Sequence, residues 1–170
     1  AMLNKSKAPE YFIDTLGFNT AQSELTPTFF KKGIIYAKSA GDDVNPATGL
    51  SYYNLFFAET KSDSSWTTST LQNVNSEVHD AAPFYDQNDK KLYFTRNNHY
   101  RGRTITSKDG QVKLELYFAT YIDNKFTGVR PLSVNSKTYS VGQPTVSPDG
   151  NVLIFASDKP GGYGGIDLYY

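Results

Sequence analysis

Histidines and paired carboxylates are the side chains in this sequence that could act on a substrate. His79 and His99 are the only two histidines, and neither lies in a Ser–His–Asp arrangement or at metal-ligand spacing. Glu24, Glu77 and Asp80 each precede an expected strand and could converge as a carboxylate set for glycoside hydrolysis. The alternative is that they accept hydrogen bonds from loop amides. No catalytic residue is assigned, and we expect a protein that is not an enzyme.

Asp158 and Asp167 flank a glycine-rich segment at residues 160–165. No Lys–Ser/Thr pair follows these glycines, and the segment leads into an expected strand instead of a helix, so a phosphate-binding loop is not predicted. A tight connection that uses positive φ angles is expected instead. The two aspartates could cap its amides, or could together bind a hard cation such as calcium. No other metal or cofactor is predicted.

The loop at residues 97–112 is the strongest candidate for a binding surface. It carries arginine and tyrosine, which are enriched at the energetic centres of protein interfaces. In the arrangement expected below, it lies beside residues 73–80, residues 135–142 and the glycine-rich segment. The alternative is a solvated loop of mixed charge. The predicted interaction face consists of His79, Asp80, Arg96, Tyr100, Arg101, Arg103, Tyr139 and Tyr163.

These residues must be positioned by a threefold repeat. Polar residues, a proline, an apolar pair, a short turn and an aromatic or β-branched strand recur at Ser23–Ser39, His79–Asn97 and Val141–Asp158. Around each phrase we expect four short strands, since turn signals separate runs rich in β-forming residues. The expected strands are residues 26–30, 34–38, 52–59 and 66–71; then 82–85, 91–95, 113–120 and 126–132; then 143–147, 152–156 and 166–170.

The sequence therefore predicts an all-β fold. A four-stranded sheet with apolar residues on both faces cannot bury them alone, and radial packing of such sheets gives a β-propeller. We expect about three blades, at residues 19–72, 73–134 and an incomplete 135–170, as part of a larger propeller. Residues 1–10 are expected to be a disordered tag or linker. Residues 11–16 are expected to form a lone strand, the closing strand of a neighbouring blade. A β-sandwich is the competing architecture.

The amino-acid composition limits the classes of partner and chemistry that this chain can have. Seventeen basic residues balance seventeen acidic ones, so no field of one sign attracts nucleic acid. No apolar run reaches the length of a membrane span, and membrane insertion by this segment is not expected. The absence of cysteine excludes disulfides, thiolate chemistry and cysteine zinc sites.

The last repeat carries a family likeness. Residues Gln143–Tyr170 resemble the WD-like propeller repeat of TolB-type proteins, through the Ser147–Gly150 turn and the strand that follows it. The segment Pro-Gly-Gly-Tyr-Gly-Gly-Ile-Asp-Leu-Tyr is similar to the propeller of OmpA-type, peptidoglycan-associated envelope proteins, including PorE-like components of type IX secretion. The resemblance implies a periplasmic, outer-membrane-associated protein whose propeller is a non-enzymatic interaction and scaffold module for other envelope proteins. It gives this chain no peptidoglycan-binding segment.

Two further hypotheses remain open at this point. One is a propeller that binds or cleaves glycans, with calcium as its cation. The other is self-association, since open edges of terminal blades promote pairing with another chain. Two chains of three blades could then close a six-bladed ring.

Overall fold

The computed structural model describes residues 12–45, 49, 51–63, 65–100 and 103–170. These residues form β-strands, turns and loops and no helix, and therefore no helix long and apolar enough to cross a membrane. The first antiparallel sheet has the order β1–β2–β3–β4. Its strands are β1 (Glu24–Phe30), β2 (Gly33–Val44), β3 (Ser51–Thr60) and β4 (Trp66–Thr70).

The second sheet repeats this order, and the third repeats its first three strands. The second consists of β5 (Asp80–Asp86), β6 (Lys91–Asn97), β9 (Leu114–Ile122) and β10 (Lys125–Pro131). The third consists of β11 (Val141–Val146), β12 (Leu153–Ser157) and β13 (Asp167–Tyr169). A small hairpin between β6 and β9 is formed by β7 (His99–Tyr100) and β8 (Arg103–Thr104).

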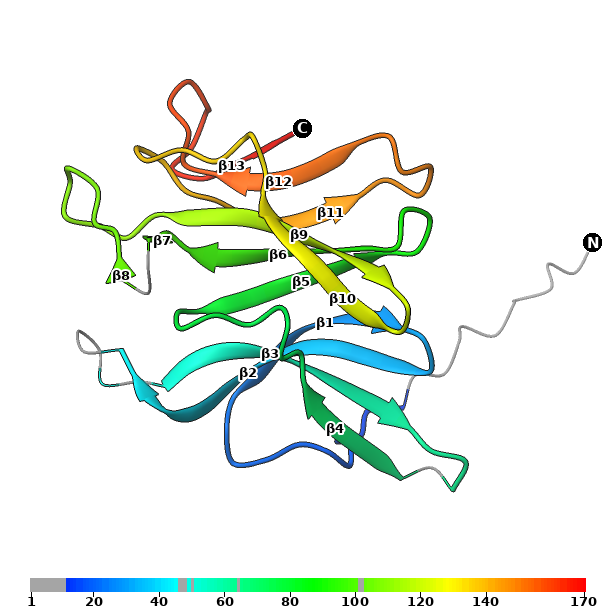
Figure 1. Ribbon diagram of the computed structural model, residues 1–170. Helices are drawn as coiled ribbons and strands as arrows, with labels where there is room; N and C mark the ends of the chain where they lie inside the picture. The colour runs from blue at the N-terminus through cyan, green and yellow to red at the C-terminus, as the bar shows by residue number, and fades with distance from the viewer. Residues whose placement is uncertain (1–11, 46–48, 50, 64, 101–102) are drawn as a thin grey trace, which may run out of the picture.

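The three sheets lie in a stack, with the second between the first and the third (Figure 1). The inner strands of the first two sheets, β1 and β5, contact one another, and β5 in turn contacts β11. The longer loops, which join second strands to third strands and one sheet to the next, lie on the left in Figure 1. The tight turns within each hairpin lie on the right. The fold thus has a loop side and a turn side.

The repeated proline marks a β-bulge in each inner strand. In β1 the register shifts between Leu25 and Thr28, and the intervening Thr26 has a φ of 50° and precedes Pro27. Proline is tolerated there because a bulge removes a ladder hydrogen bond. The other sheets place the same features at their own register shifts: Ala82 (φ 47°) before Pro83, and Gln143 (φ 52°) before Pro144.

An aromatic cluster joins the first sheet to the second. Phe30 is only 4% exposed. Its ring centroid lies 4.7 Å from that of Tyr85, 5.1 Å from Tyr121 and 5.2 Å from Phe126, all in the second sheet, and 5.2 Å from Phe57 in its own. Most of these pairs meet edge to face, which aromatic rings favour. This residue is therefore the centre of the first joint.

The joint between the second and third sheets has a smaller buried apolar cluster than the first joint. Its buried apolar residues are Leu116, Val141 and Phe155. The backbone N–H of Gln143, in the bulge of β11, donates to Thr95 Oγ1 over 2.9 Å. A bulge thus serves here as a contact between sheets as well as a bend in a strand.

The all-β class and the predicted order of strands are confirmed. Each inner strand begins two residues earlier than predicted, because the ladder continues on the far side of the bulge. Residues 12–16 pair with no strand among the described residues, and their assignment to the closing strand of a neighbouring blade stays a prediction. Residues 1–10, predicted to be a disordered tag or linker, lie outside the described residues.

Candidate functional site

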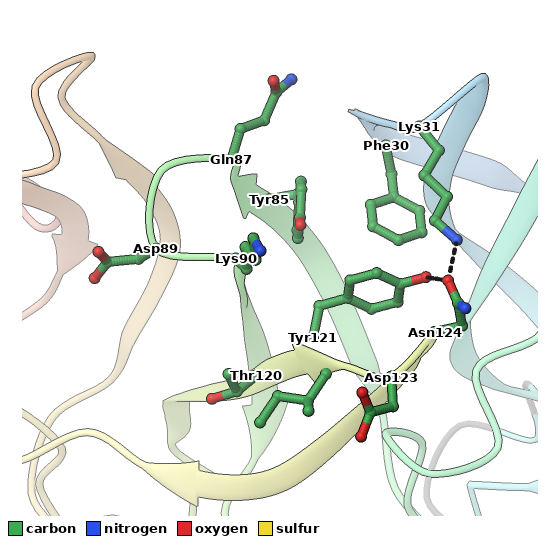
Figure 2. Close-up of a pocket in the computed structure, with 11 residues that line it drawn as sticks. Phe30, Lys31, Tyr85, Gln87, Asp89, Lys90, Thr120, Tyr121, Asp123 and Asn124 are labelled. Carbon is green, nitrogen blue, oxygen red and sulfur yellow. Dashed lines mark hydrogen bonds between the residues drawn. The ribbon is translucent and has the colours of Figure 1, made fainter.

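A hollow of about 740 Å³ lies on the turn side, between the first two sheets. We call it the turn-side groove. Figure 2 shows Phe30, Tyr85 and Tyr121 forming its aromatic wall. Its other lining residues are Lys31, Gln87, Asp89, Lys90, Thr120, Ile122, Asp123 and Asn124.

Tight turns hold the rim of the turn-side groove in place. Lys31, Lys90, Asp123 and Asn124 all have positive φ angles, of 50°, 53°, 49° and 63°. Paired positive φ angles, as at Asp123 and Asn124, are typical of two-residue hairpin turns, whose twist matches that of the flanking strands. The rim therefore consists of short, constrained turns, in contrast to the long loops on the opposite side.

A cation and an amide close one wall of the groove. Lys31 Nζ lies 4.8 Å from the centroid of the Tyr121 ring and 3.4 Å from Asn124 Oδ1. The Tyr121 hydroxyl donates to the same Asn124 oxygen over 3.2 Å. Burial raises the pKa of the Tyr85 hydroxyl in the same aromatic wall, so this phenol is neutral near pH 7. The groove therefore offers aromatic faces and fixed polar groups.

Two residues of the predicted interaction face are enclosed in the middle of the stack. Asp80 is 0% exposed, and its Oδ1 accepts a hydrogen bond from Arg96 Nε at 2.6 Å. Its other oxygen accepts from the backbone and the hydroxyl of Ser76, at 2.7 and 2.8 Å. The Arg96 guanidinium also donates to the Val74 carbonyl and lies 4.8 Å from the Tyr117 ring centroid. Asp80 and Arg96 thus form a buried ion pair inside the fold and are not exposed on an interaction face.

His79 connects the first sheet to the loop that follows it. Its Nδ1 accepts a hydrogen bond from the Tyr53 backbone N–H over 3.0 Å. Its ring lies 4.8 Å from that of Tyr52, edge on. Burial lowers the pKa of His79, which favours the neutral ring that can accept this bond. His79 thus caps an edge amide of β3.

The remaining predicted residues are not brought together on one surface by the described contacts. Tyr139 is half-buried and packs on the cluster of the second joint, whereas Tyr163 is fully exposed at the tip of the glycine-rich loop. Tyr100 and Arg103 belong to the β7–β8 hairpin, with side chains outside the described residues. Arg101 lies wholly outside them. The loop-side interaction face stays a prediction.

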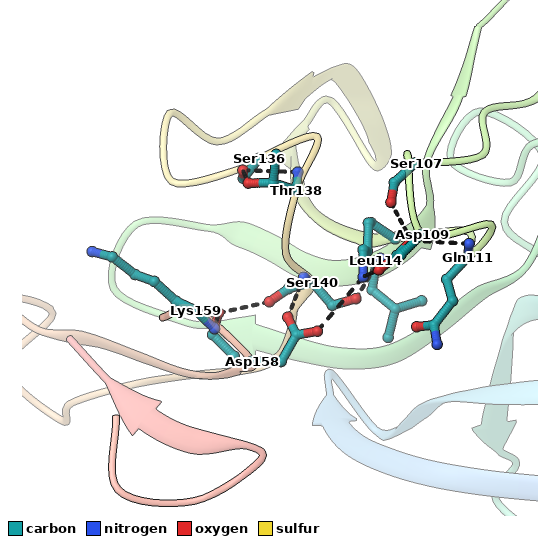
Figure 3. Close-up of polar contacts among 11 residues, drawn as sticks. Ser107, Asp109, Gln111, Leu114, Ser136, Thr138, Ser140, Asp158 and Lys159 are labelled. Atoms are coloured by element: carbon teal, nitrogen blue, oxygen red, sulfur yellow. Dashed lines mark hydrogen bonds and ion pairs between the residues drawn. The ribbon is translucent and has the colours of Figure 1, made fainter. Parts of the chain in front are cut away.

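A polar network occupies the loop side near the third sheet (Figure 3). Lys113 has a side chain only 4% exposed, and its Nζ lies 2.6 Å from Asp109 Oδ2 and 3.8 Å from Asp158 Oδ2. Asp158 Oδ1 accepts the Ser140 backbone N–H. The Lys113 ammonium, with the Ser107 hydroxyl, holds the pKa of Asp109 well below its usual range. The network ties two loops together through internal charge pairing.

The two aspartates around the glycine-rich segment act as caps. Asp167 Oδ2 accepts the Gly164 backbone N–H over 2.9 Å, while Asp158 caps a neighbouring loop. Within the segment only Gly161, with a φ of 99°, adopts a positive φ. Among the described residues no group of three or more histidine, aspartate and glutamate side chains could hold a metal ion. The contacts therefore favour capping over the calcium alternative.

Two of the three carboxylates considered for glycan cleavage, Glu24 and Asp80, make local contacts. Glu24 Oε1 accepts from the backbone and the hydroxyl of Thr20, at 3.1 and 2.5 Å. Asp80 is the buried partner of Arg96. Both residues therefore accept hydrogen bonds from loop amides, which was the alternative to a catalytic role.

In comparisons with known proteins, no family model and no curated protein matched this chain.

The turn-side groove escaped the sequence analysis because its residues come from turns far apart in the chain. Lys31 and Asn124 are 93 residues apart in sequence and yet bonded. One signal was available: Lys31-Lys32-Gly33 joins the first two strands of its repeat, and Asp123-Asn124-Lys125 joins the last two strands of the next. In an up-and-down sheet these two kinds of turn lie at the same end.

Proposed function

We propose that this chain is part of a β-propeller and acts as a non-enzymatic protein-interaction module of the bacterial cell envelope. In the proposal it works in the periplasm, in association with the outer membrane, as its resemblance to OmpA-type envelope proteins implies. A place in a complex of the type IX secretion kind follows from the same resemblance. The three sheets of one strand order, with inner strands in contact, are what neighbouring propeller blades require.

The observation that carries the proposal is the turn-side groove. Protein interfaces combine an aromatic centre with a polar rim, and aromatic residues are enriched there over lysine and aspartate. The groove shares the aromatic centre and the polar rim, with Tyr85 and Tyr121 half-buried within a rim that includes the exposed Asp89 and Lys90. Constrained turns reduce the entropy lost when a partner binds. An extended segment or loop of another protein fits such an open hollow.

Site-specific photo-crosslinking tests this function. A photoreactive amino acid is placed at Gln87 on the rim, at Tyr163 on the loop side, and at Thr68 on β4 as a control. Each protein is mixed with envelope and cytosolic fractions, and adducts are identified by mass spectrometry. We expect one defined envelope protein to crosslink at Gln87 and not at Thr68, and Tyr121→Ala to reduce that adduct at least tenfold. Adducts at Tyr163 alone would move the interface to the loop side.

A glycan panel distinguishes the alternative. Aromatic walls and polar rims also bind sugars, so oligosaccharides are titrated against the chain, and turnover is followed with and without a chelator. Saturable binding that Tyr121→Ala abolishes, without any envelope protein crosslinked at Gln87, would replace the protein-interaction proposal with a glycan-binding one. Turnover would contradict the non-enzymatic proposal.

A further inference from the structure

One leucine position has two opposite environments in this molecule. In the third strand of each sheet a leucine lies opposite the same position of the second strand, as the pairs Leu55–Ala37, Leu116–Thr95 and Leu168–Ala156. Leu55 and Leu116 are 0% exposed, whereas Leu168 is 77% exposed. The first two are covered by the sheet that follows them in the stack. Among the described residues no further sheet covers the third one in this way.

The backbone of each buried leucine is paired by the segment that follows its sheet. Leu55 N–H donates to Asn75 Oδ1 over 2.7 Å, and Asn75 Nδ2 donates to the Leu55 carbonyl over 3.0 Å. The backbone N–H of Leu71 reaches the same carbonyl, also over 3.0 Å. The asparagine carboxamide thus acts as one more residue of a fourth strand.

The second sheet repeats these contacts closely. Leu116 N–H donates to Asn135 Oδ1 over 2.8 Å, and Asn135 Nδ2 donates to the Leu116 carbonyl over 2.9 Å. Leu132 N–H donates to that carbonyl over 2.9 Å. In both sheets the backbone of the buried leucine is therefore paired by the segment that follows the sheet. That segment contains a second leucine and, three or four residues later, an asparagine; we call this leucine and asparagine the complement of the buried leucine.

The N-terminal segment carries the same complement. Asn19 N–H donates to the Leu16 carbonyl over 3.0 Å, as Asn75 N–H does to the Leu71 carbonyl. Phe18, just before this asparagine, is 8% exposed and lies 4.9 Å from the Tyr36 ring. Asn19 itself is exposed. Phe18 thus fixes this segment on the first sheet, while residues 12–16 pair with no strand among the described residues.

The two ends of the stack are apolar and exposed. Phe12 and Ile13 are 89% and 99% exposed at the first end, and Ile166 and Tyr170 are 72% and 94% exposed at the other. Apolar patches of this kind on a soluble protein mark association surfaces. Figure 1 shows the first and third sheets at opposite ends of the stack, so the two ends of one chain do not meet.

We propose that the exposed edge and face of the third sheet bind the N-terminal end of a second copy of this chain. Residues 12–16 of that copy add to β13 as its fourth strand, a β-augmentation. Asn19 pairs with the backbone of Leu168, and Leu16 N–H donates to the Leu168 carbonyl. Occupancy by this segment is favoured because it is a third version of the sequence that fills both internal joints. The proposal is independent of the turn-side groove.

The contact is head to tail, which fixes the kind of assembly expected. Each copy uses one surface to bind and a different one to be bound, so the interface is heterologous. Such contacts give a ring if the rotation closes and a filament if it does not. Burial of the first sheet's outer face against the third sheet's outer face accompanies the strand pairing.

Two variants with matched controls test the proposal. Leu168→Asp places a charge in the new joint, and Asn19→Asp sets a carboxylate oxygen against the Leu168 carbonyl. Both side chains are exposed in the single chain, so folding, checked by circular dichroism, is retained. In sedimentation velocity over a concentration series we expect the wild type to associate and each variant to dissociate at least tenfold more readily. Arg130→Asp, at an exposed position of β10 in the middle sheet and outside the turn-side groove, serves as the control and stays associated.

Mixing the two variants separates head-to-tail pairing from other modes. The Leu168→Asp copy keeps an intact N-terminal end, and the Asn19→Asp copy keeps an intact third sheet. Their mixture therefore forms one good joint and gives a one-to-one dimer that neither variant forms alone. A symmetric contact would give no such rescue and would overturn the proposal. A wild type that stays monomeric at its highest soluble concentration would also overturn it.

Discussion

The two filled joints of the stack and its open ends are built from the same residue types in different surroundings. Leu55 and Leu116 are sealed by the following sheet and paired by an asparagine, while Leu168 at the same ladder position is mostly exposed. Burial in this fold is therefore a property of stacking. The contribution of a residue to the free energy of unfolding should therefore depend more on its place in the stack than on its residue type.

Breaking the ion pair inside the stack should have the largest effect. Asp80 pairs across its ladder with Arg96, and Glu24 pairs with Lys38 at the corresponding position on the open first sheet. Asp80→Ala leaves a buried guanidinium unpaired, which costs about 3–5 kcal/mol in comparable cases. Glu24→Ala removes only contacts of a half-exposed residue. Urea denaturation of both variants measures the difference, and similar losses would contradict the comparison.

Truncating the three equivalent leucines tests the joints directly. Leu55→Ala and Leu116→Ala each leave a cavity and should lower the free energy of unfolding by about 2–5 kcal/mol. Leu168→Ala, measured at low protein concentration, should change it by no more than about 0.5 kcal/mol. The measurement is the midpoint of urea unfolding, with the slope used to confirm an unchanged transition. A large loss at Leu168 would show that the third sheet is covered within the chain.

The asparagines should follow the same order with smaller values. Asn75→Ala and Asn135→Ala leave a backbone N–H and a carbonyl of the neighbouring strand without their partner, which costs about 1–3 kcal/mol. Asn19→Ala should be close to neutral in the monomer. Thermal unfolding followed by circular dichroism ranks the three variants. Equal effects at all three positions would remove the distinction between filled joints and open end.

The smallest effect expected is a pH dependence in the first joint. His79 is uncharged when its Nδ1 accepts the Tyr53 amide, and burial lowers its pKa in the folded state. The unfolded chain then binds the proton more tightly, so this contribution is complete above about pH 6.5 and is lost as the pH falls below that value. Stability measured from pH 8 to pH 5 should decline less in His79→Gln than in the wild type. His99→Gln is the control and should retain the decline.

The repeat and the order of strands could be predicted because both are local. Each phrase around Pro27, Pro83 and Pro144 carries its own turn and strand signals, and tertiary contacts did not override them. The strand starts were missed because proline was taken as a boundary, whereas Thr26 and Pro27 form a bulge within a longer ladder.

The candidate sites were harder to predict because they depend on packing between repeats. Arginine is a residue type common at interfaces, and nothing local in the sequence shows that Arg96 forms a buried pair with Asp80. Asp80 and Arg96 become buried only when the sheets stack. Likewise, the turn-side groove exists because Lys31 and Tyr121 meet across two sheets. Sequence spacing alone does not place a cation over a ring that is 90 residues away.

The up-and-down order of the strands has a consequence for synthesis. In each of the three stacked sheets the strands pair in chain order, and the links between them are turns or loops within one repeat, with the small β7–β8 hairpin between β6 and β9. Contacts between near neighbours in sequence form quickly, because little chain entropy is lost in closing short loops. A nascent chain can therefore complete its first sheet while the third is still inside the ribosome. Ribosome-bound intermediates truncated after residue 120, in which the first sheet has left the exit tunnel, should already protect the amides of β2 and β3 from hydrogen exchange.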